Sequence, residues 1–335
     1  MKKHISILWV VLSAIVFVFC PFKSQAAPLK KINASFTALA YANPPFWIAK
    51  DLGLFEKYGL DVDLNFVRGS KGISAMVGGS IDVAQIGGLA TVAAATKGVD
   101  VVILGTVFDR LVFALHASQE IKNIKDLKGR TIGIGNRGAN SYFAGLVLMD
   151  HLGWVPDKDV KFLSVGNSPA VLAALKQGSV VAGLMTPPTT YKAVELGFPE
   201  LFNIGALNIP FPTISVACTK KFAHENPEVV LNVLRATSEA VYLYKNRTDL
   251  AFPVISKYMK LSPNEPGIAK SHALYVKAMN ERLTVPMDGI QYVLQQLAVI
   301  RKQPELKDRK TDDFINTRFL KQLEAEGFFK KLGGK

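Results

Sequence analysis

The chain has 335 residues, of which 49 % are apolar and 20 % charged, so it can bury a sizeable core and is not typical of disordered or collagen-like proteins. Its two cysteines, Cys20 and Cys218, exclude a disulfide framework and a cysteine-rich zinc site. The net charge is +13, from 40 basic and 27 acidic residues. Because the basic residues are spread along the chain without interleaved aromatics, this charge does not predict a nucleic-acid-binding protein.

The first 26 residues are typical of a secretory signal peptide. A positive start at Lys2 and Lys3 is followed by an apolar run over residues 5–20 and by small residues up to Ala26. The alternative, a membrane anchor, needs about 20 apolar residues, and this run is shorter. The sequence therefore predicts export and no direct membrane insertion after cleavage. Cys218, the thiol that remains, lies in an apolar strand-like run and is expected to be a small buried hydrophobe.

The chain after the signal peptide contains the same pattern of elements twice. The first unit has predicted strands at residues 31–40, 62–67 and 81–86, with helices ending near Leu52 and Met76. The second unit has predicted strands at residues 130–134, 160–165 and 180–185, with helices over 141–152 and 168–175. Strands that alternate with helices favour parallel sheets. The sequence therefore predicts an α/β protein of two similar lobes, each a mostly parallel sheet flanked by helices.

Polar residues mark the predicted helix starts. Asn43 and Ser168 each stand directly before a proline, and each is predicted to cap the helix that follows. Ser262 and Glu265 have the spacing of a capping box, which predicts another helix there. The chain from residue 226 onward is predicted to be mostly helical.

Three segments carry a resemblance to a known family. They read LAYANPPFWIAKDLGLFEKYGL at residues 39–60, GGSIDVA at 78–84 and DLKGRTIG at 126–133. They resemble the periplasmic solute-binding proteins of ABC importers, in the nitrate, sulfonate and taurine group, which have the type II periplasmic binding protein fold. Members of this group carry sulfonates, nitrate, taurine, pyrimidines and flavins, so the resemblance does not identify a ligand.

The resemblance implies two lobes joined by two hinge segments, with a ligand cleft between them. The crossings are expected near residues 108–113 and 207–213. Lobe one would then comprise residues 28–110 plus 212–335, and lobe two residues 111–211. The implied partners are a small-molecule ligand and an importer permease with its cytoplasmic ATPase. A periplasmic monomer without a cofactor is expected.

A glycine-rich turn offers a candidate anion site. Residues 133–138 have the spacing G-x-G-x-x-G, but a dinucleotide site also needs an acidic residue at the end of the next strand, and residues 165–167 hold none. Free N–H groups and the helix dipole at such a turn still favour an anion. The predicted ligand contacts here are Asn136, Arg137, Gly138, Asn140 and Ser141. Arg137 would supply charge, and a surface arginine in a tight turn is the alternative.

Other predicted contacts follow strands, because residues just after parallel strands line the crevice where α/β sheets bind ligands. They are Asn43, Gly69, Ser70, Gly87, Gly88, Asn167 and Thr186. Tyr41 and Trp47 are predicted to stack on a flat or apolar part of the ligand. For these aromatics, burial in the core is the alternative.

Catalysis has little support in the sequence. The histidines after the signal peptide are isolated, and no zinc-protease, nucleophile-elbow or P-loop pattern occurs, so no catalytic residue, cofactor or metal site is predicted. The sequence predicts a solute-binding protein, not an enzyme, that captures a small anionic molecule (sulfonate-like or carboxylate-like) and delivers it to a permease. An exported enzyme on the same fold, acting on a pyrimidine-like or anionic substrate, is the alternative.

Export and cleavage after Ala26 can be tested directly. N-terminal sequencing of the exported protein is expected to begin at Ala27 or Pro28, since the small residues at Ser24 and Ala26 suit signal peptidase. A lipid attached at Cys20 would contradict this prediction.

Overall fold

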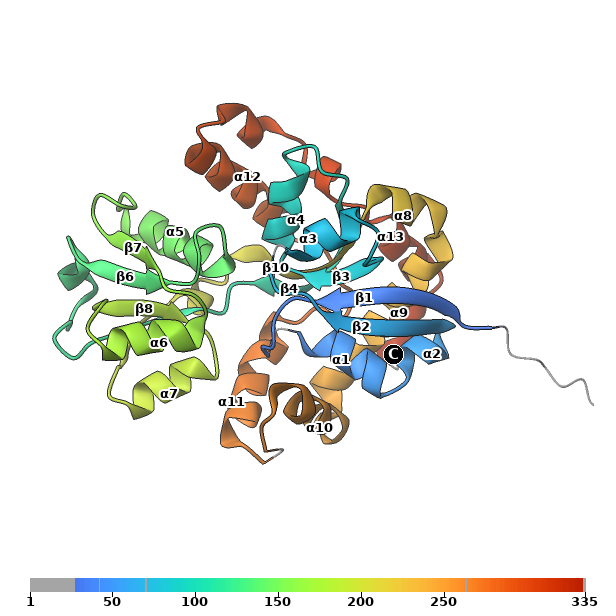
Figure 1. Cartoon of the computed structure of the whole chain (residues 1–335), viewed down its shortest axis with the longest axis horizontal. Helices are drawn as coiled ribbons and strands as arrows, with labels where there is room; N and C mark the ends of the chain where they lie inside the picture. The colour runs from blue at the N-terminus through green and yellow to red at the C-terminus, as the bar shows by residue number, and fades with distance from the viewer. Residues whose placement is uncertain (1–27, 42, 70, 263, 334–335) are drawn as a thin grey trace, which may run out of the picture.

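The structure is a computed structural model that describes residues 28–41, 43–69, 71–262 and 264–333 (Figure 1). The predicted signal peptide lies outside the described residues, and so does Ser70. The strands form two sheets. The first sheet contains β1 (Lys30–Phe36), β2 (Leu60–Phe66), β3 (Val83–Ile86), β4 (Val102–Arg110) and β10 (Pro210–Cys218). The second contains β5 (Ala114–Ala117), β6 (Thr131–Ile134), β7 (Lys161–Ser164), β8 (Ala182–Met185) and β9 (Glu200–Asn203).

The two sheets share one topology. The first has the order β2-β1-β3-β10-β4, in which β1 pairs parallel with β2 and β3, and β10 runs antiparallel between β3 and β4. The second has the order β7-β6-β8-β5-β9, in which β6 pairs parallel with β7 and β8, and β5 runs antiparallel between β8 and β9. The predicted pair of similar α/β lobes is confirmed. We call the first sheet with its helices lobe one and the second lobe two.

Helices cover both sheets. Those between the strands of lobe one are α1 (Pro44–Asp51), α2 (Leu54–Lys57), α3 (Lys71–Val77) and α4 (Gly88–Ala95). Those of lobe two are α5 (Asn140–Leu152), α6 (Ser168–Lys176) and α7 (Thr189–Glu195). The segment after β10 adds α8 (Lys220–Glu225), α9 (Pro227–Asn246), α10 (Thr248–Met259), α11 (Pro266–Tyr275), α12 (Met287–Arg301), α13 (Arg318–Ala325) and α14 (Phe328–Gly333). Short 3-10 turns lie at η1 (Ile124–Leu127), η2 (Ile204–Leu207), η3 (Val276–Ala278), η4 (Pro304–Asp308) and η5 (Thr311–Phe314).

One predicted helix end is confirmed, and two predicted helix caps are corrected. Helix α5 ends as predicted at Gly153, whose φ of 66° suits a residue without a Cβ. Helix α6 is capped by Asn167 rather than Ser168, because the Asn167 side chain accepts from the Ala170 N–H. Helix α11 begins at Pro266, and Glu265 stands at its N-cap without a side-chain cap. The capping-box prediction was therefore wrong.

The chain crosses between the sheets twice, once after β4 and once before β10 (Figure 1). The predicted lobe boundary at residues 110/111 falls at the end of β4, whereas the one at 211/212 falls inside β10, after its first two residues. Both boundaries stay a prediction about folding units. In the view of Figure 1, α12 lies above the strands β4 and β10, and α11 lies below them.

A continuous apolar core joins the lobes on the α12 side. It contains Leu89 from α4, Phe143 from α5, Phe211 from β10 and Leu294 from α12, all nearly inaccessible to solvent. The rings of Phe143 and Phe211 lie 5.8 Å apart between centroids. Helix α12 is therefore packed against both lobes, whereas a second core under α1 and α9 belongs to lobe one alone.

Cys218 is buried in β10, and burial raises the pKa of its thiol to about 12, which keeps it protonated. No helix within the described ranges combines the length and apolarity that a membrane span requires. Nor do the described residues contain a group of three or more histidine, cysteine or acidic side chains placed to hold a metal ion.

His116 provides a test of lobe two by pH. It is buried in β5, where its Nδ1 lies 3.0 Å from the Phe198 carbonyl oxygen. Burial lowers its pKa, against the opposing effects of that carbonyl and of Glu200. The unfolded chain binds a proton at a histidine near pH 6.5, so the free energy of unfolding is expected to fall as pH drops below about 6.5.

Urea unfolding between pH 7.5 and 5 measures this effect. His116→Gln is expected to flatten the pH dependence, whereas His224→Gln, at an exposed site in α8, is expected to leave it unchanged. Equal slopes in wild type and His116→Gln would contradict the assignment.

Candidate functional site

The strand-end loops of the two lobes meet at Asn140. This residue opens α5 in lobe two, and its Nδ2 donates to the Thr213 carbonyl of β10, 3.0 Å away. A Cβ at Gly87, in the loop after β3, would lie 3.9 Å from Asn140 Oδ1. Two predicted site residues from opposite lobes, Gly87 and Asn140, are therefore neighbours.

Gly88 lies against the chain's own backbone. A Cβ there would stand 2.6 Å from Pro212 Cβ, 2.7 Å from the Pro212 carbonyl oxygen and 2.7 Å from Ser215 Oγ. Gly88 was predicted to contact the ligand, because glycine permits a close approach to the backbone. The close approach that the structure shows is instead between α4 and β10. A contact with ligand at this residue stays a prediction.

Asn43 stands at the N-cap of α1 as predicted, but its side chain makes no cap hydrogen bond. The buried Gln85 of β3 does this instead, since its Oε1 accepts from the Phe46 N–H at 3.0 Å and its Nε2 donates to Asn43 Oδ1 at 3.1 Å. Asn43 is fully buried, and its Nδ2 has no partner among the described residues. The amide is therefore held in place through its oxygen, while its Nδ2 group has both N–H donors unpaired among the described residues.

Arg137 is paired with Asp157. Its Nη2 lies 2.8 Å from both carboxylate oxygens, and its guanidinium carbon lies 5.4 Å from the centroid of the Tyr142 ring. This pairing lowers the pKa of Asp157. It also gives the Arg137 guanidinium a carboxylate partner within the protein, where the sequence predicts an anionic ligand. Anion binding by Arg137 stays a prediction.

The other predicted contacts in the glycine turn differ in their exposure to solvent. Asn136 and Gly138 are exposed, and Gly138 has a φ of 81°. Ser141 is buried, and its hydroxyl already accepts from the Gly135 N–H at 2.9 Å. Of these residues, Asn140 is the one that the structure brings against lobe one.

Thr186 follows β8 and lies beside the start of α6. Its N–H donates to Ser168 Oγ at 3.2 Å, and the two hydroxyl oxygens are 3.3 Å apart. Because Asn167 caps the helix, the Ser168 hydroxyl is available for this contact. Gly69, after β2, is exposed with a φ of 58°, and a Cβ there would meet no atom of the described residues within 4 Å.

Tyr41 and Trp47 are both completely buried. The Trp47 ring stacks on Tyr258 at 4.9 Å and meets Phe36 edge-on at 5.4 Å, so in this conformation it belongs to the core of lobe one. Tyr41 stacks on Tyr275 of α11 at 6.3 Å. Tyr41 therefore lies beside the segment where α11 approaches lobe two.

Helix α11 supplies residues that the sequence did not single out. Lys270 Nζ lies 5.9 Å from the centroid of the Tyr191 ring in α7, and a Cβ at Gly267 would lie 3.7 Å from Pro188 Cβ. The pKa of Tyr275 is raised by burial, and the nearby Thr186 hydroxyl opposes that rise. Lobe one thus touches the start of α7 through α11.

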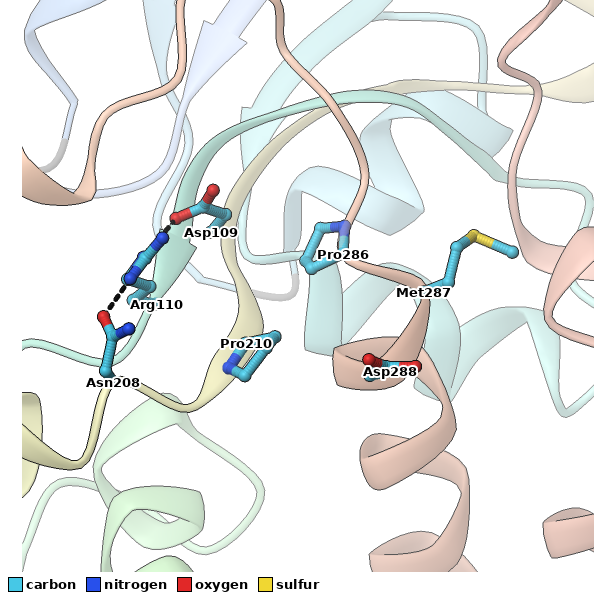
Figure 2. A pocket seen from close by; sticks show the side chains of 7 residues that line it. All are labelled: Asp109, Arg110, Asn208, Pro210, Pro286, Met287 and Asp288. Atoms are coloured by element: carbon cyan, nitrogen blue, oxygen red, sulfur yellow. Dashed lines mark hydrogen bonds and ion pairs between the residues drawn. The ribbon is translucent and has the colours of Figure 1, made fainter.

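A cavity of about 250 Å³ marks the hinge (Figure 2). Arg110, at the end of β4, donates to Asn208 Oδ1 on the second crossing, and its Nε lies 3.1 Å from Asp109. Across the cavity stand Pro286, Met287 and Asp288 at the start of α12. The arginine ties the two crossing segments to each other, so this cavity belongs to the hinge and not to the strand-end loops.

Comparison with known proteins supplies the family. Residues 43–249 match the model of the family described as NMT1/THI5 like. The chain belongs to this family. It is 28 % identical over 220 residues to a Brucella abortus protein named as a binding protein, covering 64 % of this chain and 67 % of that one. It is 25 % identical over 204 residues to the riboflavin-binding protein RibY of Chloroflexus aurantiacus, covering 58 % of this chain and 56 % of that one.

Solved structures of periplasmic binding proteins share the fold. The aliphatic sulphonate binding protein SsuA of Escherichia coli aligns with a TM-score of 0.66 at 20 % identity, covering 86 % of this chain and 92 % of that one. The nitrate-binding protein NrtA of Synechocystis PCC 6803 aligns with a TM-score of 0.67 at 16 % identity, covering 89 % of each chain. The chain therefore has the two-lobed α/β fold of periplasmic binding proteins, as its sequence predicts.

The packing of Gly88 predicts a difference between two adjacent glycines. Gly88→Ala forces a methyl group against Pro212 and Ser215 and is expected to destabilise the protein by about 1–3 kcal/mol, the usual cost of overpacking. Gly87→Ala meets Thr213 and Asn140 at 3.7 Å and 3.9 Å, which is ordinary contact, and is expected to unfold near the wild-type temperature. Thermal unfolding measures the stability of the two variants. Equal stability would contradict the close packing of α4 on β10.

Proposed function

We propose that this protein is an extracytoplasmic solute-binding protein of an ABC importer. It captures a small organic molecule between its lobes and delivers it to a permease that works with a cytoplasmic ATPase. The lobes close by a hinge motion at the two crossing segments, and the solute favours closure because it contacts both lobes.

One observation carries the proposal: strand-end loops of both lobes face each other at a single junction. Asn140 of lobe two reaches Thr213 and Gly87 of lobe one, and α11 of lobe one reaches Thr186 at the end of β8. In α/β sheets, ligands bind beyond the carboxyl ends of the parallel strands. The family, the fold and the names of the matched binding proteins support the same function.

Thermal unfolding in the presence of candidate solutes tests the proposal. Taurine, an alkanesulfonate and nitrate represent solutes that carry an anionic group, as the sequence predicts, and riboflavin represents a flat class without one. A solute at 100 times its dissociation constant adds about 2.7 kcal/mol to the free energy of unfolding, so a true ligand raises the unfolding temperature by several degrees. The protein is unfolded in guanidinium and refolded first, which removes any bound solute.

Two further readouts separate solute binding from the enzyme alternative. Small-angle scattering is expected to show a smaller radius with the solute, because closure brings the lobes together. Chromatography is expected to recover the solute chemically unchanged after incubation. Conversion of the solute would favour an enzyme, and the absence of a shift with every solute, together with no small molecule on the protein purified from cells, would contradict the proposal.

A further inference from the structure

Four hydroxyl groups are buried in lobe one without a hydrogen-bond partner among the described residues. One is that of Ser35 in β1, and the other three belong to Tyr41, in the loop before α1, to Tyr244 of α9 and to Ser271 of α11. All three side chains are completely inaccessible to solvent. Buried polar groups in proteins nearly always have partners, and each exception costs stability, so three together require an explanation.

These three hydroxyls form one cluster. Ser271 stands one helical turn before Tyr275, whose ring stacks on Tyr41. Helix α11 is held against α9 through His272, whose Nε2 lies 2.7 Å from the Tyr244 carbonyl oxygen. The pKa of Tyr244 is raised by its burial and by the charges that Tyr275 and Tyr41 would carry, which places the phenols close together. We call Tyr41, Tyr244, Ser271 and Tyr275 the hydroxyl cluster.

The hydroxyl cluster faces lobe two, because α11 meets the start of α7 where Lys270 Nζ lies 5.9 Å from the Tyr191 ring centroid and a Cβ at Gly267 would lie 3.7 Å from Pro188 Cβ. The Ser271 hydroxyl lies near Tyr191 of α7 and lowers the pKa of that phenol against the effect of burial. Thr186, at the end of β8, acts in the same way on Tyr275. The cluster therefore lies where α11 meets the strand-end loop of the opposite lobe, in the region that the proposed function assigns to the solute. Tyr244, Ser271 and Tyr275 were not among the residues singled out from the sequence.

The chemistry of the cluster suits an uncharged group. A phenol or a serine hydroxyl donates one hydrogen bond and accepts others, so the cluster can satisfy a carbonyl, a hydroxyl or an amide. Burial, and then the charge of Glu265, raise the pKa of Tyr41 to about 12 against the opposing effect of the Ser271 hydroxyl, which keeps this phenol neutral. The charged side chains that α11 and its N-cap bring to the junction, Glu265 and Lys270, have opposite signs and offer an anion no net attraction.

We propose that Tyr41, Tyr244 and Ser271 bind an uncharged hydrogen-bonding group of the solute. The inference rests on the proposed function and names the class of ligand that this junction selects. The three hydroxyls have no partner among the described residues, and the solute would supply one when the lobes close over it.

The unsatisfied hydroxyls give a test that needs no ligand. In the refolded, solute-free protein, Tyr41→Phe and Ser271→Ala are each expected to raise the unfolding temperature, because each removes a buried polar atom that lacks a partner. The matched control is Tyr58→Phe. The Tyr58 hydroxyl donates to Glu239 Oε2 at 2.6 Å, so its loss is expected to lower the unfolding temperature. If Tyr41→Phe and Ser271→Ala lower it as Tyr58→Phe does, the hydroxyls are satisfied inside the solute-free protein, for instance by buried water, and the inference is overturned.

The solute panel then separates this inference from the proposed function. A shift with riboflavin that Tyr41→Phe reduces, and that Tyr58→Phe leaves intact, supports the hydroxyl cluster as the binding group. Loss of one hydrogen bond is expected to weaken binding about 5- to 10-fold. A shift with only taurine, the alkanesulfonate or nitrate overturns the uncharged class and leaves solute binding in place.

Discussion

Strand β10 is the element on which both the fold and the site depend. It runs antiparallel between β3 and β4, and it carries the chain back from lobe two into lobe one. Two helices approach its backbone so closely that they present glycine, Gly88 in α4 and Gly289 in α12. Phe211 packs on lobe two, and the Thr213 carbonyl accepts from Asn140. One strand therefore fixes the hinge, the packing of two helices and the contact between opposing loops.

The two sides of the lobe junction differ in chemistry, and this difference bears on how the lobes move. On the α12 side the contact is an apolar core, reinforced by hydrogen bonds from Tyr292 and Gln296 to Asp150 of α5. On the α11 side, hydroxyl groups and a lysine face lobe two. Separation at α12 would expose apolar surface to water, which costs free energy. For the hinge motion that we propose, the α12 side is therefore expected to stay in contact.

The local features of this fold were predictable from sequence because they depend on neighbours along the chain. The repeated strand and helix pattern, the proline at the start of α1 and Gly153 after α5 are examples. A local rule failed where a distant residue competed. Gln85, from β3, takes the capping bond that Asn43 was expected to make.

The hydroxyl cluster was not predictable because its members come from distant parts of the chain. Tyr41 and Ser271 are brought together only when α11 packs beside the loop before α1, and a serine in a helix or a tyrosine in a loop carries no signal alone. Net charge is an incomplete guide to the ligand for a related reason. The chain carries +13, which favours encounter with anions at long range, yet selection at the junction depends on the groups within contact distance. There the neutral hydroxyls lie near both Glu265 and Lys270, and the uncharged ligand that we propose follows from these local groups and not from the field of the whole protein.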